Sequence, residues 1–383
     1  MSRAFAAVIG VLALATVAGL VALWPGEVGT KLGEGLAKKS DQAQIERIEQ
    51  FRCSGFQTNT CSKVTVRLES GRRKGTTGML SLGTSGIDPE VSVGDRLRVV
   101  RAQTTPDVEM PPEQEYSLTD FERRGSMLLL ALLFGALMVV LGRVRGALSL
   151  VGLALSLLVV LAFVVPAILT GEKLLVAVVG SMAIVLVTVP LAHGLGAKGL
   201  AAVLGTAASL GLTVALAALF TDLTNLTGLA SEEANLLGAN ETGVSLQGLL
   251  LAGMIIGALG VLDDVTVSQA STVMALRGAN PTLGARELFG RALRVGRDHV
   301  SATVNTLVLA YVGASLPLLL IFSSSELGLV ETANLEVIAK EIVATLVGSI
   351  GLMVAVPITT ALAAVLAVRL PAKRLADANV HVH

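Results

Sequence analysis

The chain alternates between long stretches without charged residues and short polar connections. Eight of these stretches are long and apolar enough to cross a bilayer, because a membrane helix needs about 20 residues. They lie near 4–24, 126–142, 146–168, 174–192, 199–220, 245–263, 300–322 and 342–368. Backbone polar groups in hydrocarbon must bond internally, and the stretches lack the period-2 polarity of barrel strands. The pattern predicts an all-α polytopic membrane helix bundle of about eight helices.

The segment between the first two predicted spans, residues 25–123, changes to a strand-like pattern. Polar and apolar residues alternate over three short runs, which predict strands at 63–69, 79–82 and 96–100. Short strands joined by tight turns favour a small β-domain, OB-like or barrel-like. We expect a short helix or stalk at 30–50 before the strands. A proline-containing linker is expected at 104–115 after them.

These patterns divide the chain into four parts. We predict an N-terminal membrane anchor, an extracytoplasmic β-rich domain with its linker, a seven-helix membrane domain and a cytoplasmic tail, at 1–24, 25–123, 124–370 and 371–383. A cleaved signal peptide is the alternative for the first span. Its apolar core is long for that role, and no clean Ala-x-Ala cleavage site precedes Trp24. Cleavage would leave seven spans in the same arrangement.

Composition supports the membrane assignment, and the distribution of charge predicts the orientation. Hydrophobic residues make up 53% of the 383 residues and charged residues 15%, with no net charge. Cytoplasmic loops are enriched in Lys and Arg. One set of helix ends carries Arg3, Arg143, Arg145, Lys198, Arg277, Arg286, Arg291, Arg294, Arg297, Arg369, Lys373 and Arg374. The opposite short loops carry only Lys173 and Lys340, so we predict cytoplasmic termini and an extracytoplasmic 25–123 segment.

Both cysteines, Cys53 and Cys61, lie in the predicted outer domain. Thiols outside the cytoplasm can oxidise, and a bridge across this short loop would staple a small domain. Metal or redox chemistry is the alternative, but no histidine or second cysteine pair stands near them. We therefore expect a structural disulfide.

Two adjacent carboxylates, Asp263 and Asp264, follow the uncharged run 242–262. A charged aspartate at the centre of a membrane helix costs about 2.5–3.5 kcal/mol on insertion, so such a pair needs a reason. Three glycines before the pair make one helix side small, which predicts a closely packed neighbour; they are Gly253, Gly257 and Gly260. Polar side chains after the pair supply oxygen ligands: Thr266, Ser268 and Gln269.

Neighbouring helix residues point about 100° apart, so both carboxylates cannot face one ligand from a regular helix. Either one faces the bundle and one faces water, or the helix unwinds there, as at transporter ion sites. The alternative is that the pair marks the wet cytoplasmic end of the span 245–263. His299 and Asn305 open the next span, and His299 suits proton relay. An interfacial hydrogen bond is its plainer role.

Residues 282–298 predict an amphipathic helix that lies on the inner leaflet before the span 300–322. Nucleic-acid binding is not expected from one short basic helix. The chain has no Walker loop, His-Glu-x-x-His or Gly-x-Ser-x-Gly motif. We therefore expect neither an enzyme nor a cofactor, and the identity of any bound metal stays open.

The stretch Gly257-Ala-Leu-Gly-Val-Leu-Asp-Asp-Val-Thr-Val-Ser-Gln-Ala-Ser, continuing to Arg277-Gly-Ala-Asn-Pro281, resembles the signature of the YibE/F family of bacterial multi-pass membrane proteins. The order of an N-terminal span, an extracytoplasmic segment and about seven further spans is also similar to that family. The resemblance implies this architecture in a bacterial cytoplasmic membrane. It singles out Asp263 and Asp264 and implies no substrate.

Two functions from different classes fit these features. The first is a secondary transporter that handles a cation or a proton-coupled small solute, with Asp263, Asp264, Thr266, Ser268, Gln269, His299 and Asn305 as the binding residues. The second is a membrane scaffold or accessory subunit whose outer β-domain binds an envelope partner. The bilayer is a partner in both cases, and oligomerisation stays open.

Overall fold

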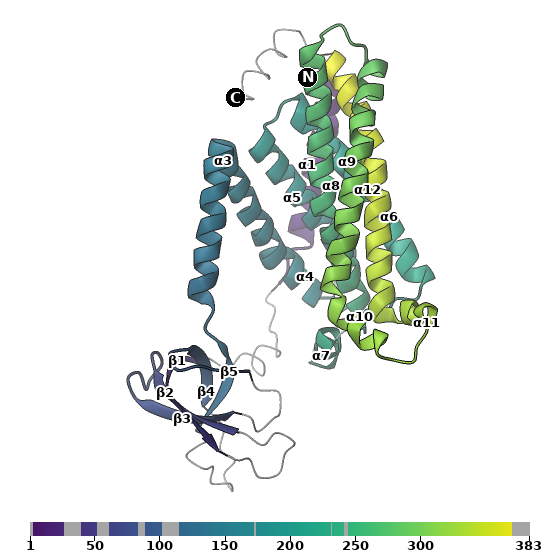
Figure 1. Cartoon of the computed structure of the whole chain (residues 1–383). Coiled ribbons are helices and arrows are strands. Elements are labelled where there is room, and N and C mark those ends of the chain that lie inside the picture. The colour runs from purple at the N-terminus through teal and green to yellow at the C-terminus, as the bar shows by residue number, and fades with distance from the viewer. Residues whose placement is uncertain are drawn as a thin grey trace. The chain divides into compact units, whose positions relative to one another are not determined.

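The computed structural model describes residues 3–26, 40–51, 61–82, 89–101, 115–171, 174–230, 232–240 and 244–369 (Figure 1). The chain divides into two compact units. One is Lys31–Leu137, and the other combines Met1–Thr30 with Met138–His383. Each unit has a hydrophobic core of its own, strand-based in the first and helical in the second. They are called the β unit and the membrane unit below.

The β unit is built on a curled antiparallel sheet of five strands, in the order β3-β2-β1-β4-β5. The strands are β1 (Asp41–Phe51), β2 (Cys61–Leu68), β3 (Thr77–Leu82), β4 (Arg96–Arg101) and β5 (Tyr116–Phe121). The two edge strands approach each other, since the ring of Tyr116 in β5 fills the space beside Gly78 in β3. Ile45, Val64 and Leu97 are buried inside the curl.

The central strand β1 corrects the second half of the helix or stalk predicted at 30–50, whereas residues 30–39 lie outside the described residues. Ala43 and Ile45 point into the core, whereas most other residues of β1 are polar and partly exposed. Because β1 has few apolar residues, the alternation of apolar and polar positions was too weak to identify it as a strand in the sequence. The strand β5 was also missed beside the predicted linker, most of which lies outside the described residues.

The cysteine prediction falls partly outside the described residues. Cys61 begins β2, is buried, and belongs to a disulfide. Cys53, the only other cysteine of the chain, is not among the described residues.

The remaining elements are helical: α1 (Arg3–Ala22), α3 (Arg124–Val159), the π-helix η2 (Val160–Val164), α4 (Val165–Leu169), α5 (Leu174–His193), α6 (Ala197–Leu223), α7 (Glu232–Asn240), α8 (Leu246–Ala279), α9 (Ala285–Ala314), α10 (Leu316–Ser323), α11 (Leu329–Asn334) and α12 (Glu336–Val368). Six continuous helical stretches of the described chain are long and apolar enough to cross a membrane. A seventh span results if α9 and α10, which meet at 63°, cross together. Large apolar side chains such as Leu141 and Leu320 remain exposed, as lipid-facing side chains do.

Eight membrane spans were predicted, more than the six or seven of the structure, because Arg124–Leu169 forms one helical stretch of 46 residues in the described chain. At about 1.5 Å per residue it exceeds twice the thickness of a bilayer core. The backbone leaves helical geometry at Arg143, with φ 51° and ψ −132°. There is no room for a Cβ at Gly146, because the carbonyl oxygen of Met138 lies there. The chain therefore turns back on itself near Arg143, between the predicted spans 126–142 and 146–168.

The core of the membrane unit is formed by α6, α8, α9 and α12, which run side by side (Figure 1). Two glycines allow α6 and α12 to approach closely: Thr359 of α12 contacts Gly205, and Thr213 of α6 contacts Gly351. The predicted close packing on the α8 glycines is wrong for two of them. A Cβ at Gly253 or Gly260 would meet nothing within 4 Å.

Two further boundaries differ from the predictions. α8 does not end at the aspartates but continues to Ala279, because the polar residues that follow them pack against other helices. The amphipathic segment 282–298 is not a separate helix, since α9 runs without a break from Ala285 to Ala314. Its residues Leu288, Ala292 and Gly296 are buried in the core.

Candidate functional site

The two aspartates lie near the middle of α8 and point in different directions. The helix is continuous through them, so the predicted unwinding does not occur. Asp263 turns inward, and its buried Oδ1 atom has no hydrogen-bond partner in the described part of the chain. Asp264 turns away from the protein, with 69% of its side chain exposed. The 100° between neighbouring helix residues explains the divergence.

The sequence holds α8 in place at both ends. Ser245 caps the N-terminus, where its hydroxyl accepts a hydrogen bond from the Gly248 amide at 3.1 Å. In the last turn of α8, Arg277 donates to the Leu283 carbonyl at 2.6 Å, across the turn that leads into α9. The first proline after α8 is Pro281, so nothing interrupts the helix earlier.

Thr266 and Gln269, two of the predicted ligands, hold α8 against its neighbours. The hydroxyls of Thr266 and Thr206 of α6 are 2.6 Å apart in a buried contact. The Thr360 hydroxyl of α12 donates to Gln269 Oε1 at 3.0 Å. Side-chain hydrogen bonds between membrane helices typically contribute about 0.6–2 kcal/mol each. These contacts fix α6, α8 and α12 around the inward face of Asp263.

A seam of buried hydroxyls runs along the same interface. Ser209 and Thr359 are fully buried, yet their side-chain oxygens have no hydrogen-bond partner among the described residues. Ser349, with 4% exposure, is in the same condition. Thr213 differs, since its hydroxyl donates back to the Ser209 carbonyl at 2.9 Å. Unsatisfied buried polar atoms are uncommon, and a water or ion is a frequent cause.

Two contacts between α6 and α8 show how deep Asp263 lies along the bundle. Thr206 faces Thr266, and Gln247 near the start of α8 donates to Asp222 near the end of α6 at 3.4 Å, so the two helices are antiparallel. Thr206 is eight residues after Lys198, the basic residue at the start of α6. At about 1.5 Å per residue, Thr266 is about 12 Å from the level of Lys198 and Asp263 about 16 Å. The inward carboxylate thus lies well inside the length of α6.

His299 joins the site from α9. Its Nε2 atom is buried, lies 3.9 Å from Asp264 Oδ2 and forms no hydrogen bond with any described residue. The imidazole is half-exposed and lies close to the middle of α9. A histidine within reach of a carboxylate can exchange a proton with it.

The other two predicted site residues lie apart from this arrangement. Ser268 is half-buried on α8, and its carbonyl accepts the Thr272 hydroxyl at 2.9 Å. Asn305 is exposed on α9, six residues after His299 and therefore on a different side of the helix. Among the described residues, no three His, Cys, Asp or Glu side chains are grouped as a metal site.

A cavity of about 240 Å³ lies at the end of the bundle where α8 and α12 begin, and the sequence did not suggest it. Its polar side chains are Tyr311 of α9 and Lys340 and Glu341 of α12. Lys340 Nζ and Glu341 Oε1 are 3.8 Å apart, and the two side chains are only 22% and 30% exposed. In the sequence, Lys340 contributed only to the predicted orientation. Two neighbouring opposite charges close to an apolar run were the available signal.

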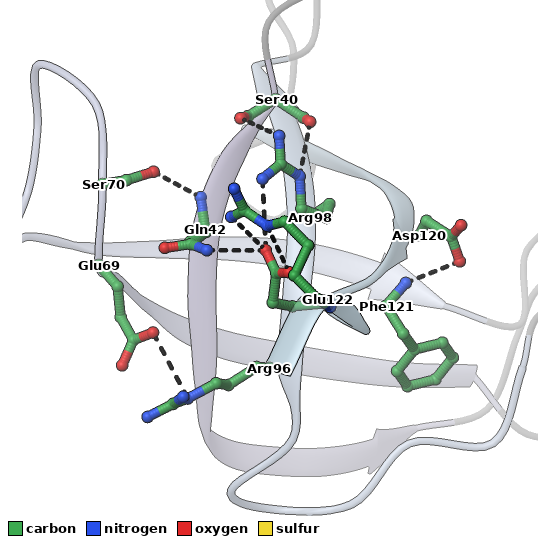
Figure 2. A network of polar contacts seen from close by, with 10 residues as sticks. Ser40, Gln42, Glu69, Ser70, Arg96, Arg98, Asp120, Phe121 and Glu122 are labelled. Atoms are coloured by element: carbon green, nitrogen blue, oxygen red, sulfur yellow. Dashed lines mark hydrogen bonds and ion pairs between the residues drawn. The ribbon is translucent and has the colours of Figure 1, made fainter. Parts of the chain in front are cut away.

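The β unit holds a carboxylate of a different kind. Figure 2 shows Glu122 facing Gln42 of β1 and Arg98 of β4. Gln42 Nε2 donates to it at 2.7 Å and Arg98 Nη1 at 3.3 Å. Arg124, at the start of α3, donates two side-chain bonds at 2.7 Å and a backbone bond at 3.1 Å. Only 8% of the Glu122 side chain is exposed.

These donors favour the ionised carboxylate. The bonds from Arg124, then those from Gln42 and Arg98, hold the pKa of Glu122 far below its ordinary value, against the opposing effect of burial. The pKa of Asp120 is also lowered, first by the Phe121 amide and then by Arg123. The arrangement ties β1, β4 and the end of β5 to the first residues of α3.

Several helices long and apolar enough to cross a membrane, with the Asp263 Oδ1 atom buried between them and unpartnered among the described residues, indicate a multi-pass helical membrane protein. The model of the YibE/F-like protein family matches residues 130–369, well over half of the chain. The chain belongs to that family, as the Leu-Asp-Asp-Val-Thr segment predicted. No curated protein and no solved structure matches the chain.

Proposed function

We propose that the protein is a secondary transporter in which Asp263 binds and releases a cation or a proton as a small solute crosses the membrane. The supporting observation is that Asp263 Oδ1 is buried in the helical core and that no described residue forms a hydrogen bond with it. A permanent ion at this position would be expensive to bury unpaired. A carboxylate that is periodically neutralised by a bound ion or proton avoids that cost.

The residues around Asp263 suit a hard cation or a proton. The hydroxyls of Thr206, Ser209 and Thr266 lie within about one helical turn of its level, by the antiparallel register of α6 and α8. Hydroxyl and carboxylate oxygens are the ligands that hard cations prefer. On the other side of α8, Asp264 and His299 offer a second pair of proton-exchanging groups.

The proposal includes eight spans, with both termini in the cytoplasm and the β unit outside. The turn at Arg143 supports a division of Arg124–Leu169 into two passes. The concentration of Lys and Arg at one set of helix ends supports the orientation. The β unit then folds in an oxidising space, in agreement with the disulfide of Cys61. Its strand order, with β3 near β5, suits a five-stranded OB-like barrel.

A second candidate is the accessory role, in which the β unit binds an envelope protein. The separate hydrophobic core of this unit favours it, because such a unit can present a surface independently of transport. Removal of residues 40–110 tests this role. Loss of a co-purifying protein with membrane insertion intact supports it, and an unchanged set of co-purifying proteins counts against it.

Ion flux across reconstituted vesicles tests the transporter. Purified protein is placed in lipid vesicles, proton and sodium gradients are imposed in separate runs, and their dissipation is compared with that in empty vesicles. We expect wild type to dissipate at least one gradient and Asp263→Asn to behave like empty vesicles. Asp264→Asn should retain part of the flux, because its side chain lies outside the core.

Asp222→Asn is the matched control, since it makes the same chemical change at an exposed position near the far end of α6. It should transport like wild type. Flux that is unchanged in both Asp263→Asn and Asp264→Asn would end the transporter proposal.

A further inference from the structure

The cavity at the end of the bundle where α8 and α12 begin is a built pocket. Its wall includes Leu249, Leu250 and Met254 of α8 and Ala344 of α12. Gly253 contributes an open floor, since nothing lies within 4 Å of a Cβ placed there. The volume of about 240 Å³ is below the roughly 300–1,000 Å³ of drug-sized pockets, so the occupant has few heavy atoms.

The loop that covers this pocket is held in position. Gly228 and Ala230 line the pocket from the loop after α6. Glu336, the first residue of α12, accepts the amides of Thr227 and Gly228 at 2.8 and 2.7 Å and the Thr227 hydroxyl at 2.8 Å. Gly228 has φ 82°, and the Leu246 carbonyl oxygen occupies the space beside it. The covering loop is therefore tied to the first residues of both α8 and α12.

The two charges of the pocket retain unused hydrogen-bonding capacity. Lys340 Nζ and Glu341 Oε1 are 3.8 Å apart, which is too long for a hydrogen bond. An ammonium has three donors, and a carboxylate has several lone pairs. The Tyr311 hydroxyl adds a donor and acceptor in the same cavity. The charges sum to zero, so a singly charged ligand would match one of them and oppose the other.

We propose that this pocket binds a small zwitterion, an α-amino acid with a short apolar side chain. Its carboxylate lies toward Lys340 and its ammonium toward Glu341, and the apolar wall accepts the side chain. The pocket shares α8 with Asp263 and Asp264, and it shares α9 with His299. The two helices meet beside the pocket, where the Tyr311 hydroxyl lies 3.1 Å from the Cβ position of Gly257. The inference rests on the proposed function for the movement of this solute, whereas binding can be measured without transport.

Ligand-induced stabilisation of the purified, full-length protein in detergent tests the pocket. The probes are L-alanine and L-valine as zwitterions, propylamine as a cation and propionate as an anion. We expect a saturable rise in the thermal unfolding midpoint with a zwitterion only. Lys340→Met and Glu341→Gln should each weaken the binding at least tenfold.

A matched pair of glycine variants separates filling of the pocket from a general effect on α8. Gly253→Leu fills the cavity, and Gly260→Leu adds the same side chain where equally open space surrounds the Cβ, outside the lining residues. We expect Gly253→Leu to abolish binding and Gly260→Leu to preserve it. Gel filtration of both variants shows whether each remains folded, and Gly253→Ala provides a milder filling if the larger side chain disturbs the helix.

The pocket assignment is overturned if none of the probes binds, if propylamine or propionate binds as well as the zwitterions, or if the folded Gly253 variants bind like wild type. Failure of the transporter proposal gives a different pattern. Binding of a zwitterion without any Asp263-dependent flux would leave the pocket assigned and remove the transport role. Asp263-dependent ion flux without zwitterion binding would do the reverse.

Discussion

Glu122 of the β unit and Asp263 of the membrane unit are two largely sheltered carboxylates in opposite conditions. Glu122 accepts hydrogen bonds from Gln42, Arg98 and Arg124, whereas Asp263 Oδ1 accepts none among the described residues. A fully partnered carboxylate stabilises one conformation. An unpartnered one costs free energy as long as it is charged, which is the physical basis of the ion exchange proposed for Asp263.

The largest expected effect concerns transport. Asp263→Asn should reduce ion flux to that of empty vesicles, because the amide cannot bind a cation or a proton as a carboxylate does. The same variant should unfold at a midpoint equal to or above that of wild type, since it removes a charge that has no partner. A lower midpoint together with wild-type flux would contradict the assignment.

The next effect concerns the stability of the β unit. Glu122→Gln should lower the thermal midpoint of this unit and leave vesicle flux unchanged, because it removes the charge that Arg98 and Arg124 share. Glu69→Gln is the matched control, since among the described residues the Glu69 carboxylate has one ion pair, with Arg96 at 3.6 Å. Circular dichroism in the strand region gives both midpoints. Equal losses in the two variants would show that Glu122 has no special role.

Acid should produce a smaller, graded effect on the same unit. The pKa values of Glu122 and Asp120 are lowered in the folded state, so their contribution to stability is present above the ordinary carboxylate pKa. It is lost as the pH falls below about 4.5 toward the folded-state pKa values. Unfolding midpoints measured between neutral and acid pH should fall less steeply for Glu122→Gln. Parallel curves for the two proteins would contradict this origin of the acid sensitivity.

The smallest effect concerns the hydroxyl contact that sets the register of α6 and α8. Thr206→Val and Thr266→Val should each cost about 0.5–1.5 kcal/mol of stability, with the double variant costing less than the sum. The single contact at 2.6 Å is shared, so its loss is counted once. Thermal unfolding of wild type, the two single variants and the double variant in detergent measures the stabilities for this double-mutant cycle. Strict additivity would show that the contact contributes nothing.

The long charge-free runs predicted most membrane helices well, since α5 and α6 begin and end within a few residues of the predicted spans. The same reasoning ended α8 at Asp263. The polarity of Thr266 and Gln269 resembles a helix end in the sequence, but these side chains are buried against α6 and α12. The position at which α8 ends depends on contacts with helices that are distant in the sequence, and the local pattern of polar residues does not predict these contacts.

Only part of the arrangement around Asp263 and Asp264 could be predicted from the sequence. Helix geometry required Asp263 and Asp264 to diverge, whereas the choice of the inward residue depends on the register of α6 against α8. Asn305 was proposed from proximity in sequence to His299 and lies on another side of α9. Lys340 and Glu341 line a cavity with segments up to 113 residues away in the chain, such as Gly228, and no local pattern reveals that.

Infrared difference spectroscopy of carboxyl groups measures directly whether Asp263 binds and releases a cation or a proton. Purified wild type, Asp263→Asn and the control Asp222→Asn are each subjected to the same change of pH or sodium concentration. We expect a carboxyl signal in wild type and in Asp222→Asn that is missing from Asp263→Asn. An identical difference spectrum in all three proteins would contradict it.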